Sequence, residues 1–418
     1  MDLVSQIHDF GRRARAAARA LRQCSTEQKN RGILAMAEQM LAAQAAILDA
    51  NAQDVWKAKV DNLSAAMIDR LTLDAQRVAK MAEGISEVAA LPDPVGEILR
   101  DWTRPNGLRI QKKRVPIGVV GIIYESRPNV TSDAAVLCLK TGNATILRGG
   151  RESIHSNVAI AKALSAGCAA AGLPADAILL IPTTDREGVR VMCEMDQYLD
   201  CIVPRGGKGL IETVVSHARM PVIKHYDGIC VMYVDKDADL AMAESIVLNA
   251  KVQRPGVCNA IETVLVHRDV AEQFFAQTGR ALLAAKVEIR GDEATRALLP
   301  EAKAATAQDF RTEFLDLILA AKVVGDAGEA ITHIEENGSH HSDGIVTANA
   351  ATAEQFLAEV DSATVYWNAS TRFTDGGEFG FGAEIGISTD KLHARGPMAL
   401  EELTTYKYVL RGNGQIRS

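Results

Sequence analysis

The chain has 418 residues, of which 47% are hydrophobic and 24% charged, with 32 glycines and 12 prolines. This composition is typical of a globular protein of two or three domains and excludes a disordered, collagen-like or fibrous chain. The chain has 46 Lys and Arg residues and 53 Asp and Glu residues, which give a net charge of −7. This charge gives no broad attraction to nucleic acid or anionic membranes. No apolar run approaches the ~18 residues of a membrane helix, so no membrane span is predicted.

Residues 1 to about 100 show apolar side chains at helical spacing. The first part of this region is rich in arginine, at Arg12, Arg13, Arg15, Arg19 and Arg22. A transit peptide is basic and amphipathic in the same way, but Asp2, Asp9 and the unbroken helical pattern favour the solvated face of a first helix.

The segment 107–118, GLRIQKKRVPIG, alternates like an exposed strand with a basic face. Two interpretations stay open. It is an edge strand protected by its lysines, or a strand lent to a neighbouring subunit.

From 115 to 235, strand-like runs such as VGIIY, ATILR, AILLIP and LDCIVP alternate with helical stretches. This rhythm predicts an α/β fold with a doubly wound, Rossmann-type parallel sheet, whose ligands bind beyond the carboxyl ends of the strands. Glycines and cations follow two of these runs, as Arg148-Gly149-Gly150-Arg151 and as Arg205-Gly206-Gly207-Lys208-Gly209. Each cluster is either a plain turn or a phosphate cradle at a helix start, and two of them together favour a nucleotide cofactor.

A second α/β segment extends from about 236 to 360, beginning with a helix over 237–249. The last part holds VYWNAS, a glycine-dense stretch over 376–388 and the strand-like TTYKYVLRG. The glycines predict either the wall of a ligand pocket, where backbone approaches a ligand closely, or solvent-side turns.

Seven scattered cysteines form no CxxC pattern, so we expect reduced thiols and a cytoplasmic protein. Six of them lie among apolar neighbours or beside a strand and are interpreted as small buried hydrophobes: Cys24, Cys138, Cys168, Cys193, Cys201 and Cys230. Cys258 differs, because Pro255 and Gly256 break regular structure just before it and Arg254 and Asn259 flank it. A kinked loop beside a cation is the setting of a cysteine nucleophile, although a structural role stays open.

The loop VQRPGVCNAIET (252–263) resembles the cysteine loop of the γ-glutamyl phosphate reductase family, in the aldehyde dehydrogenase superfamily. Four other segments resemble motifs of that family, namely 115–153, AITHIEENGSHHSDGIVT (330–347), FGFGAEIGIST (379–389) and 395–415. The likeness therefore extends from about residue 115 to the end of the sequence.

The resemblance implies an enzyme that reduces L-glutamyl 5-phosphate to L-glutamate 5-semialdehyde with NADPH, a step of L-proline biosynthesis. It also implies a three-part organisation, which comprises an NADP-binding domain (1–106 and 119–235), a catalytic domain (236–360 and 371–394) and oligomerisation segments (107–118, 361–370 and 395–418). The partners it implies are a second copy of the chain, in a homodimer or a dimer of dimers, and transiently glutamate 5-kinase.

Cys258 matches the nucleophile of the family and would form a thioester with loss of phosphate. Its backbone N–H is the expected first donor to the oxyanion, with Ser126 or Asn259 as the second. Arg127 and Arg254 are candidates for binding the anionic groups of the substrate.

His225 stands where hydrolytic aldehyde dehydrogenases carry the glutamate that activates water. Its loss fits a reductase whose thioester must survive, and we place His225 at the substrate, with a buried structural histidine as the alternative. An ordinary hydrolytic aldehyde dehydrogenase is thereby disfavoured. An inactive scaffold relative is disfavoured too, because the cysteine and both cation clusters are present.

The predicted cofactor residues are Arg148, Gly149, Arg151, Arg205, Gly206, Gly207 and Lys208. Arg151 lies where NAD-preferring relatives often carry a glutamate, and an arginine there would accept the 2′-phosphate of NADP. A solvated surface arginine is the alternative. Although His333, His340, His341 and Asp343 have a spacing that suggests a metal, no metal is expected, because neither the chemistry nor the family requires one.

Overall fold

The computed structural model describes residues 2–417, except for the side chain of Ala66. The chain divides into two compact units. The first comprises Met1–Lys224, Gly380–Gly386 and Met398–Ser418, and the second comprises His225–Phe379 and Ile387–Pro397.

The first unit begins with helices, as predicted. They are α1 (Leu3–Leu21), α2 (Thr26–Ala42), α3 (Gln44–Val60), α4 (Ala65–Leu71) and α5 (Ala75–Ala90). Local sequence sets where they start: the side chain of Asp2 accepts the N–H of Ser5 at 2.7 Å, and Ser25 with Gln28 forms a capping box.

The arginines of α1 are not all solvated, which corrects the predicted solvated face. Arg15 forms an ion pair with Asp200 at 2.6 Å, and Arg13 forms one with Asp176. Because Ile7, Ala14 and Leu21 of α1 are buried, the helix packs on its unit through both its apolar and its basic residues.

A parallel sheet of order β5-β4-β3-β6 forms the centre of the first unit, as the rhythm of 115–235 predicts. Its strands are β3 (Val119–Tyr124), β4 (Ala144–Arg148), β5 (Ile178–Leu180) and β6 (Cys201–Arg205). The helices that connect them are α6 (Asn129–Lys140), α7 (Ile154–Ala170) and α8 (Glu187–Cys193), and α9 (Lys208–His217) follows β6. Every residue of β3 and β4 is buried, as expected for strands covered on both faces.

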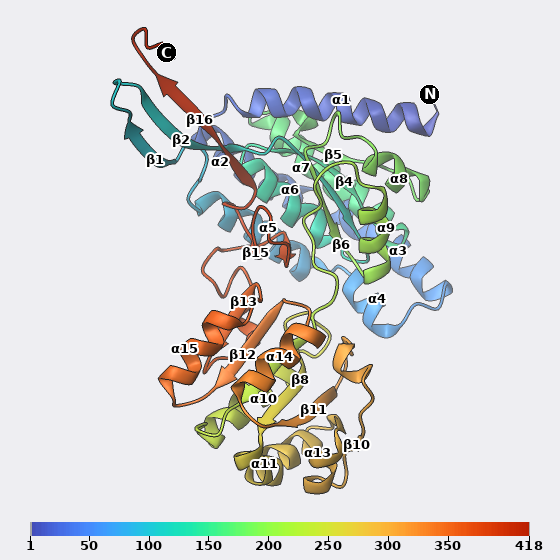
Figure 1. The fold of residues 1–418 in the computed structure, drawn as a ribbon. Coiled ribbons are helices and arrows are strands. Elements are labelled where there is room, and N and C mark those ends of the chain that lie inside the picture. Colours follow the sequence, from blue (N-terminus) through green and yellow to red (C-terminus); the bar gives the residue numbers. More distant parts are fainter. Residues whose placement is uncertain (1, 418) are drawn as a thin grey trace. The chain divides into compact units, whose positions relative to one another are not determined.

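An antiparallel ribbon of order β1-β2-β16 extends from the first unit (Figure 1). It consists of β1 (Ile98–Thr103), β2 (Arg109–Pro116) and β16 (Thr404–Arg411). The predicted edge strand within 107–118 is therefore wrong as to position. β2 is the middle strand, because its partner β16 comes from the distant C-terminal part of the chain.

The second unit contains a sheet of order β10-β9-β11-β8-β7-β12-β13, in which every pair of neighbouring strands is parallel. Its strands are β7 (Cys230–Val234), β8 (Ile261–His267), β9 (Glu288–Gly291), β10 (Lys303–Ala304), β11 (Ile318–Val324), β12 (Ser342–Val346) and β13 (Thr364–Trp367). Its α-helices are α10 (Leu240–Val252), α11 (Arg268–Phe274), α12 (Arg280–Ala284), α13 (Glu293–Leu298), α14 (Ala327–Asn337) and α15 (Ala350–Glu359).

Alternation along β7 divides the core of the second unit between the two faces of the sheet. Met232 and Val234 belong to one cluster of buried side chains, together with those of α10 and α11. Val231 and Tyr233 belong to another, with those of α14 and α15. Side chains two apart share a face of a strand, so helices cover both faces.

The observed units differ from the predicted organisation in several places, and residues 380–386, predicted to belong to the catalytic domain, lie in the first unit. The first unit ends at Lys224 and not at 235, it includes the ribbon, and 361–370 lies in the second unit with β13 as an edge strand of its sheet. The chain crosses between the units in β14 (Gly386–Ser388) and β15 (Gly396–Met398). Within the described residues no single helix has the length and apolarity of a membrane span, although α2 and α3 meet those criteria as a pair bent by 66°.

Candidate active site

Cys258 lies on the irregular segment between α10 and β8, as the Pro255-Gly256 break predicts. Its side chain is half-buried, whereas Cys138, Cys168, Cys193, Cys201 and Cys230 are buried. Cys24, just beyond the end of α1, is half-buried too and is therefore not the buried hydrophobe that was expected. Exposure and loop geometry thus set Cys258 apart from the core thiols.

The amino ends of three neighbouring strands place Cys258 beside two histidines. β8 begins soon after Cys258, β12 begins directly after His341, and both pair with β7. The ligand atoms of His225, Cys258 and His341 lie within 4.8 Å of one another. The two imidazole rings meet edge to face, with centroids 5.2 Å apart. In this unit the candidate nucleophile therefore lies at the amino ends of the strands.

A chain of hydroxyl groups orients His341. Its Nδ1 lies 2.9 Å from the Oγ of Ser342, which lies 2.7 Å from the Oγ1 of Thr374, and the hydroxyl of Tyr366 lies 2.7 Å from the same Oγ1. Burial, and secondarily the charge of His225, lowers the pKa of His341 well below its ordinary value. His341 is therefore a neutral imidazole near neutral pH.

Cys230 lies directly behind the candidate nucleophile. Its thiol donates to the carbonyl oxygen of Cys258 at 3.1 Å and lies 3.7 Å from the Nδ1 of His341. Burial raises the pKa of Cys230 well above its usual value, so the group stays a neutral thiol. The apolar run around Cys230 predicts its burial but not this contact with the backbone of Cys258.

Gly228 packs against the same backbone. A Cβ atom at this position would lie 2.0 Å from the carbonyl oxygen and 2.4 Å from the Cα of Cys258. Since these are backbone atoms that cannot rotate away, glycine is required here for the observed position of the cysteine loop.

The two predicted side-chain oxyanion donors are engaged elsewhere. The amide Nδ2 of Asn259 donates to the carbonyl oxygens of Thr374, at 2.9 Å, and Arg372, at 3.4 Å. Ser126 belongs to the first unit, where both its hydroxyl and its backbone N–H donate to Glu152. These contacts make Asn259 a residue that positions the cysteine loop, and not an oxyanion donor.

The predicted substrate residues lie in both units. Arg254 is exposed on the cysteine loop, and Arg127 follows β3 in the first unit. The Nδ1 of half-buried His225 lies 3.0 Å from the carbonyl oxygen of Ile387. Sequence reasoning missed Arg372, whose Nε donates to Gln253 at 2.9 Å. Arg372 is therefore a second arginine beside the loop. Burial, and then the charge of Arg254, lowers the pKa of Arg372.

The predicted cofactor residues follow the carboxyl ends of β4 and β6, on the first unit's parallel sheet. Buried Arg148 donates to the carbonyl oxygens of Gly149, Thr184 and Asp185 at 2.9 to 3.3 Å, so it ties β4 to the segment after β5. Its Nε, in contrast, is buried and lacks a hydrogen-bond partner among the described residues. A Cβ on Gly149 would lie 2.0 Å from the side-chain nitrogen of Asn157, so this turn is tightly packed.

A carboxylate lies at the start of α9. The backbone N–H of Gly207 donates to the Oε2 of Glu125 at 3.0 Å, and a Cβ on Gly206 would lie 2.3 Å from that oxygen. Lys208, the first residue of the helix, is exposed, while Arg205 at the end of β6 is half-buried. The helix start thus already binds an anionic group of the chain itself.

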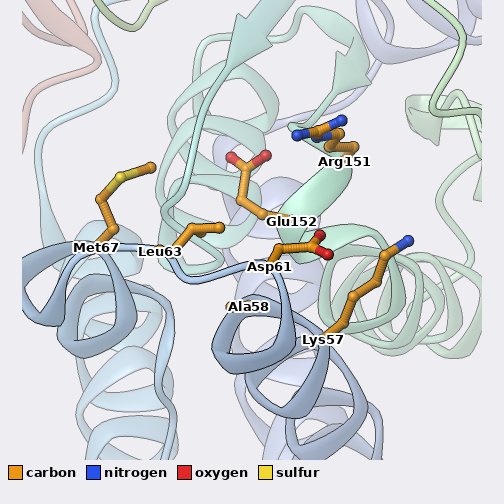
Figure 2. A pocket seen from close by; sticks show the side chains of 7 residues that line it. All are labelled: Lys57, Ala58, Asp61, Leu63, Met67, Arg151 and Glu152. Atoms are coloured by element: carbon orange, nitrogen blue, oxygen red, sulfur yellow. The ribbon is translucent and has the colours of Figure 1, made fainter.

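Figure 2 shows a pocket of about 100 Å³ beside Arg151, in the first unit. The charged side chains that line it are those of Lys57 and Asp61, at the end of α3, and of Arg151 and Glu152. Ala58, Leu63 and Met67 complete the lining. Lys57 has no motif around it, so sequence reasoning gave no reason to select it.

The histidine-rich motif does not converge on one point. His333 lies on α14 against the ring of Phe310, His340 contacts the carbonyl oxygen of Asp361, and His341 contacts Ser342. Asp343 accepts the N–H of Val231 at 2.7 Å. Of these four residues, His341 belongs to the cluster with Cys258.

Residues 4–311 match the model of the Aldehyde dehydrogenase family. A γ-glutamyl phosphate reductase of Moorella thermoacetica is 57% identical over 417 residues, which cover 100% of both chains. The reductase of Caldanaerobacter subterraneus is 56% identical over 99% of this chain and 100% of its own. The crystal structure of γ-glutamyl phosphate reductase from Thermotoga maritima matches with a TM-score of 0.97 and 45% identity, covering 99% of this chain and 100% of that one. The expected aldehyde-dehydrogenase-like fold is confirmed, and the chain belongs to the γ-glutamyl phosphate reductases of the aldehyde dehydrogenase family.

Proposed function

We propose that this chain reduces L-glutamyl 5-phosphate to L-glutamate 5-semialdehyde and phosphate, in L-proline biosynthesis, through a thioester on Cys258. The observation that carries this proposal is the half-buried thiol of Cys258 on its loop, within 4.8 Å of ligand atoms of His225 and His341. The full-length likeness to curated γ-glutamyl phosphate reductases supports the choice of substrate.

The first step is displacement of phosphate by Cys258. The sulfur bonds to the acyl carbon, the bond from that carbon to the phosphate oxygen breaks, and the thiol proton passes to a nearby base. The cofactor, when bound, would supply the hydride that reduces the thioester. The C–S bond then breaks, which releases the aldehyde and the thiolate of Cys258, and the thiolate takes back its proton from the base.

Retention of the thioester depends on keeping water inactive beside it. His225 stands where the hydrolytic relatives carry their glutamate, and its Nδ1 contacts the carbonyl oxygen of Ile387. This contact with its own chain supports a positioning role for His225 rather than activation of water. The hydrolytic reaction is therefore not favoured.

Members of this family use NAD(P), and we place the dinucleotide at the carboxyl ends of β4 and β6. The Nε of Arg148, which has no hydrogen-bond partner among the described residues, and the tight turn at Gly149 fit a ligand close to the backbone. Arg151 and Lys57, which line one pocket, would bind the 2′-phosphate and favour NADP over NAD. Pockets for whole drug-sized ligands are about 300–1,000 Å³, so this one would hold only part of the cofactor.

For the anionic groups of the substrate we propose Arg254 and Arg372 beside the cysteine loop, together with Arg127. Arg372 is held by Gln253, and its lowered pKa follows first from burial. A guanidinium with restricted solvent access binds carboxylate or phosphate more strongly than a fully hydrated one.

We further propose a cytoplasmic homo-oligomer, a dimer or a tetramer, that assembles through the ribbon. Large apolar or aromatic side chains are exposed there, namely Ile98, Leu99, Tyr406, Tyr408 and Leu410. An exposed apolar patch on paired strands is typical of a subunit interface. Contact with glutamate 5-kinase stays a prediction.

The test is the reverse reaction. Pyrroline-5-carboxylate, in equilibrium with the open aldehyde, is incubated with NADP, with and without inorganic phosphate, and NADPH is followed by absorbance. We expect phosphate-dependent NADPH formation that Cys258→Ser abolishes. Formation without phosphate would indicate a hydrolytic dehydrogenase, and no turnover with a folded protein would contradict the proposed activity.

A further inference from the structure

The cluster of His225, Cys258 and His341 has the composition of a transition-metal site. It offers two imidazoles and one thiolate, the ligand types that zinc prefers, within 4.8 Å of one another. His341 is fully buried, and its Nε2 is one of the buried polar atoms that lack a hydrogen-bond partner in the described part of the chain. We propose that this cluster binds one Zn²⁺ ion reversibly and that the bound ion inhibits the enzyme.

The hydroxyl chain behind His341 prepares that imidazole as a ligand. If Nδ1–H donates to Ser342 and the hydroxyl of Ser342 donates to Thr374, the lone pair of the ring is on Nε2. A hydrogen bond of this kind, made by the ring nitrogen that does not bind the metal, fixes the tautomer and the ring orientation of metal-binding histidines. The orphaned Nε2 is therefore a donor atom that has a lone pair to offer to a cation.

The three side chains need only small movements to bind the ion. Zn–S and Zn–N bonds of about 2.3 and 2.0–2.1 Å in a tetrahedron place the ligand atoms about 3.5 Å apart. His225 and Cys258 are half-buried and adjust by side-chain rotation, whereas buried His341 stays in place. Three protein ligands leave a fourth position for water.

Binding occupies the sulfur that the proposed reaction uses. The thiol of Cys258 releases its proton to solvent as the Zn–S bond forms, so about one proton is released per ion. The metal-bound sulfur is then unavailable for attack on an acyl phosphate. Only the inhibition rests on the proposed nucleophilic role of Cys258, because binding itself depends on the ligand set.

Binding is tested separately from activity. The full-length protein, freed of metal under a non-chelating reductant, is titrated with Zn²⁺, and bound ion is counted by native mass spectrometry. Co²⁺ then serves as a spectroscopic probe, since thiolate ligation gives a charge-transfer band. We expect one ion per chain, the cobalt band, slowed alkylation of Cys258 by iodoacetamide, and loss of activity that EDTA restores.

The variants His225→Gln, His341→Gln and Cys258→Ser should each weaken binding about tenfold or more. His217→Ala and Cys24→Ser are the matched controls, because they remove an imidazole and a thiol outside the cluster, and they should bind Zn²⁺ like the parent chain. Thermal unfolding shows whether buried His341 tolerates substitution. Should His341→Gln not fold, His225→Gln and Cys258→Ser test the site.

Binding that survives in Cys258→Ser with its full affinity would overturn the site, as would equal binding by His225→Gln and the parent. The absence of stoichiometric binding at micromolar Zn²⁺ would also overturn it. A chain that binds zinc at this cluster but lacks reductase activity would keep the metal site and contradict the proposed function instead.

Discussion

The thiol of Cys230 donates to the carbonyl oxygen of Cys258 across 3.1 Å, so one cysteine holds the backbone of another. Cys230 is fully buried at the start of β7, while Cys258 is half-buried on its loop. Cys230 stays protonated and supports the loop, whereas the thiol of Cys258 is accessible for the proposed reaction.

Replacing Cys230 tests this support. Cys230→Ala removes a hydrogen bond of about 1 kcal/mol, and we expect kcat to fall about fivefold with KM nearly unchanged. Cys230→Ser keeps a donor at the same place and should retain most of the activity. Steady-state kinetics in the reverse direction, with thermal unfolding alongside, separates this effect from loss of folding. Equal kcat values for Cys230→Ala and the parent would show that the hydrogen bond from Cys230 does not help to position Cys258.

Gly228→Ala is expected to displace the cysteine loop, because the new Cβ would lie 2.0 Å from the carbonyl oxygen of Cys258. We expect activity to fall at least about a hundredfold, as a misplacement of about 1 Å costs that much, and the alkylation rate of Cys258 to change. Gly84→Ala, in α5, is the control, because no described atom outside the neighbouring residues and backbone of its own helix lies within 4 Å of the added Cβ. It should keep full activity and gain about 0.5–1 kcal/mol of stability. An active Gly228→Ala enzyme would show that the loop can shift without cost.

Arg151→Glu tests cofactor preference. A carboxylate beside the 2′-phosphate repels it, so the KM for NADP should rise about tenfold or more, while the KM for NAD stays the same or falls. Lys57→Ala should also raise the KM for NADP, but by a smaller factor, because it removes one of two cations that line the pocket. Kinetics with both cofactors gives the ratio directly. Unchanged KM values for NADP in both variants would show that the 2′-phosphate does not bind at Arg151 and Lys57.

Asp343 predicts a pH dependence of stability. Burial raises its pKa to about 7 in the folded chain, against 3.8 ordinarily, so its favourable contribution is complete below pH 4 and is lost as the pH rises through 7. Asp343→Asn can still accept from Val231 and, through its amide, donate to Ser362. Its stability relative to the parent should therefore increase between pH 4 and 8, by up to about 4 kcal/mol.

Asp361→Asn is the control of opposite sign. Hydrogen bonds from Lys391 and Arg395 lower the pKa of Asp361 to about 2, so this carboxylate stabilises the fold above its unfolded pKa. Its removal should destabilise the chain at neutral pH and have little effect in acid. Denaturant titrations at several pH values measure both variants, and parallel pH curves for Asp343→Asn and the parent would contradict the assignment to Asp343.

Local signals in the sequence are sufficient to locate the cysteine loop and the parallel sheets. Pro255 and Gly256 cannot continue α10, so the loop at Cys258 follows from the chemistry of two residues. The glycine and cation clusters after β4 and β6 are likewise local, and the fold places both at the predicted strand ends.

The surroundings of Cys258 depend on pairing over long distances. Cys230 reaches it across 28 residues of sequence, and His341 reaches Cys230 across 111, because β7, β8 and β12 happen to be neighbours in the sheet. No local pattern of residues predicts that these three strands are neighbours. The same reason explains why the edge-strand interpretation of 107–118 was wrong, since the second partner of β2, β16, lies near the other end of the chain.

The carboxylate of Glu125 on the N–H of Gly207 has a consequence for cofactor exchange. If the dinucleotide phosphates bind at the start of α9, they must replace an internal competitor whose effective concentration is fixed by the chain and does not vary with the cell's metabolite pool. When the oxidised cofactor dissociates, the carboxylate of Glu125 can again accept the N–H of Gly207. The apparent affinity for the dinucleotide is thereby lowered, which limits retention of the oxidised cofactor.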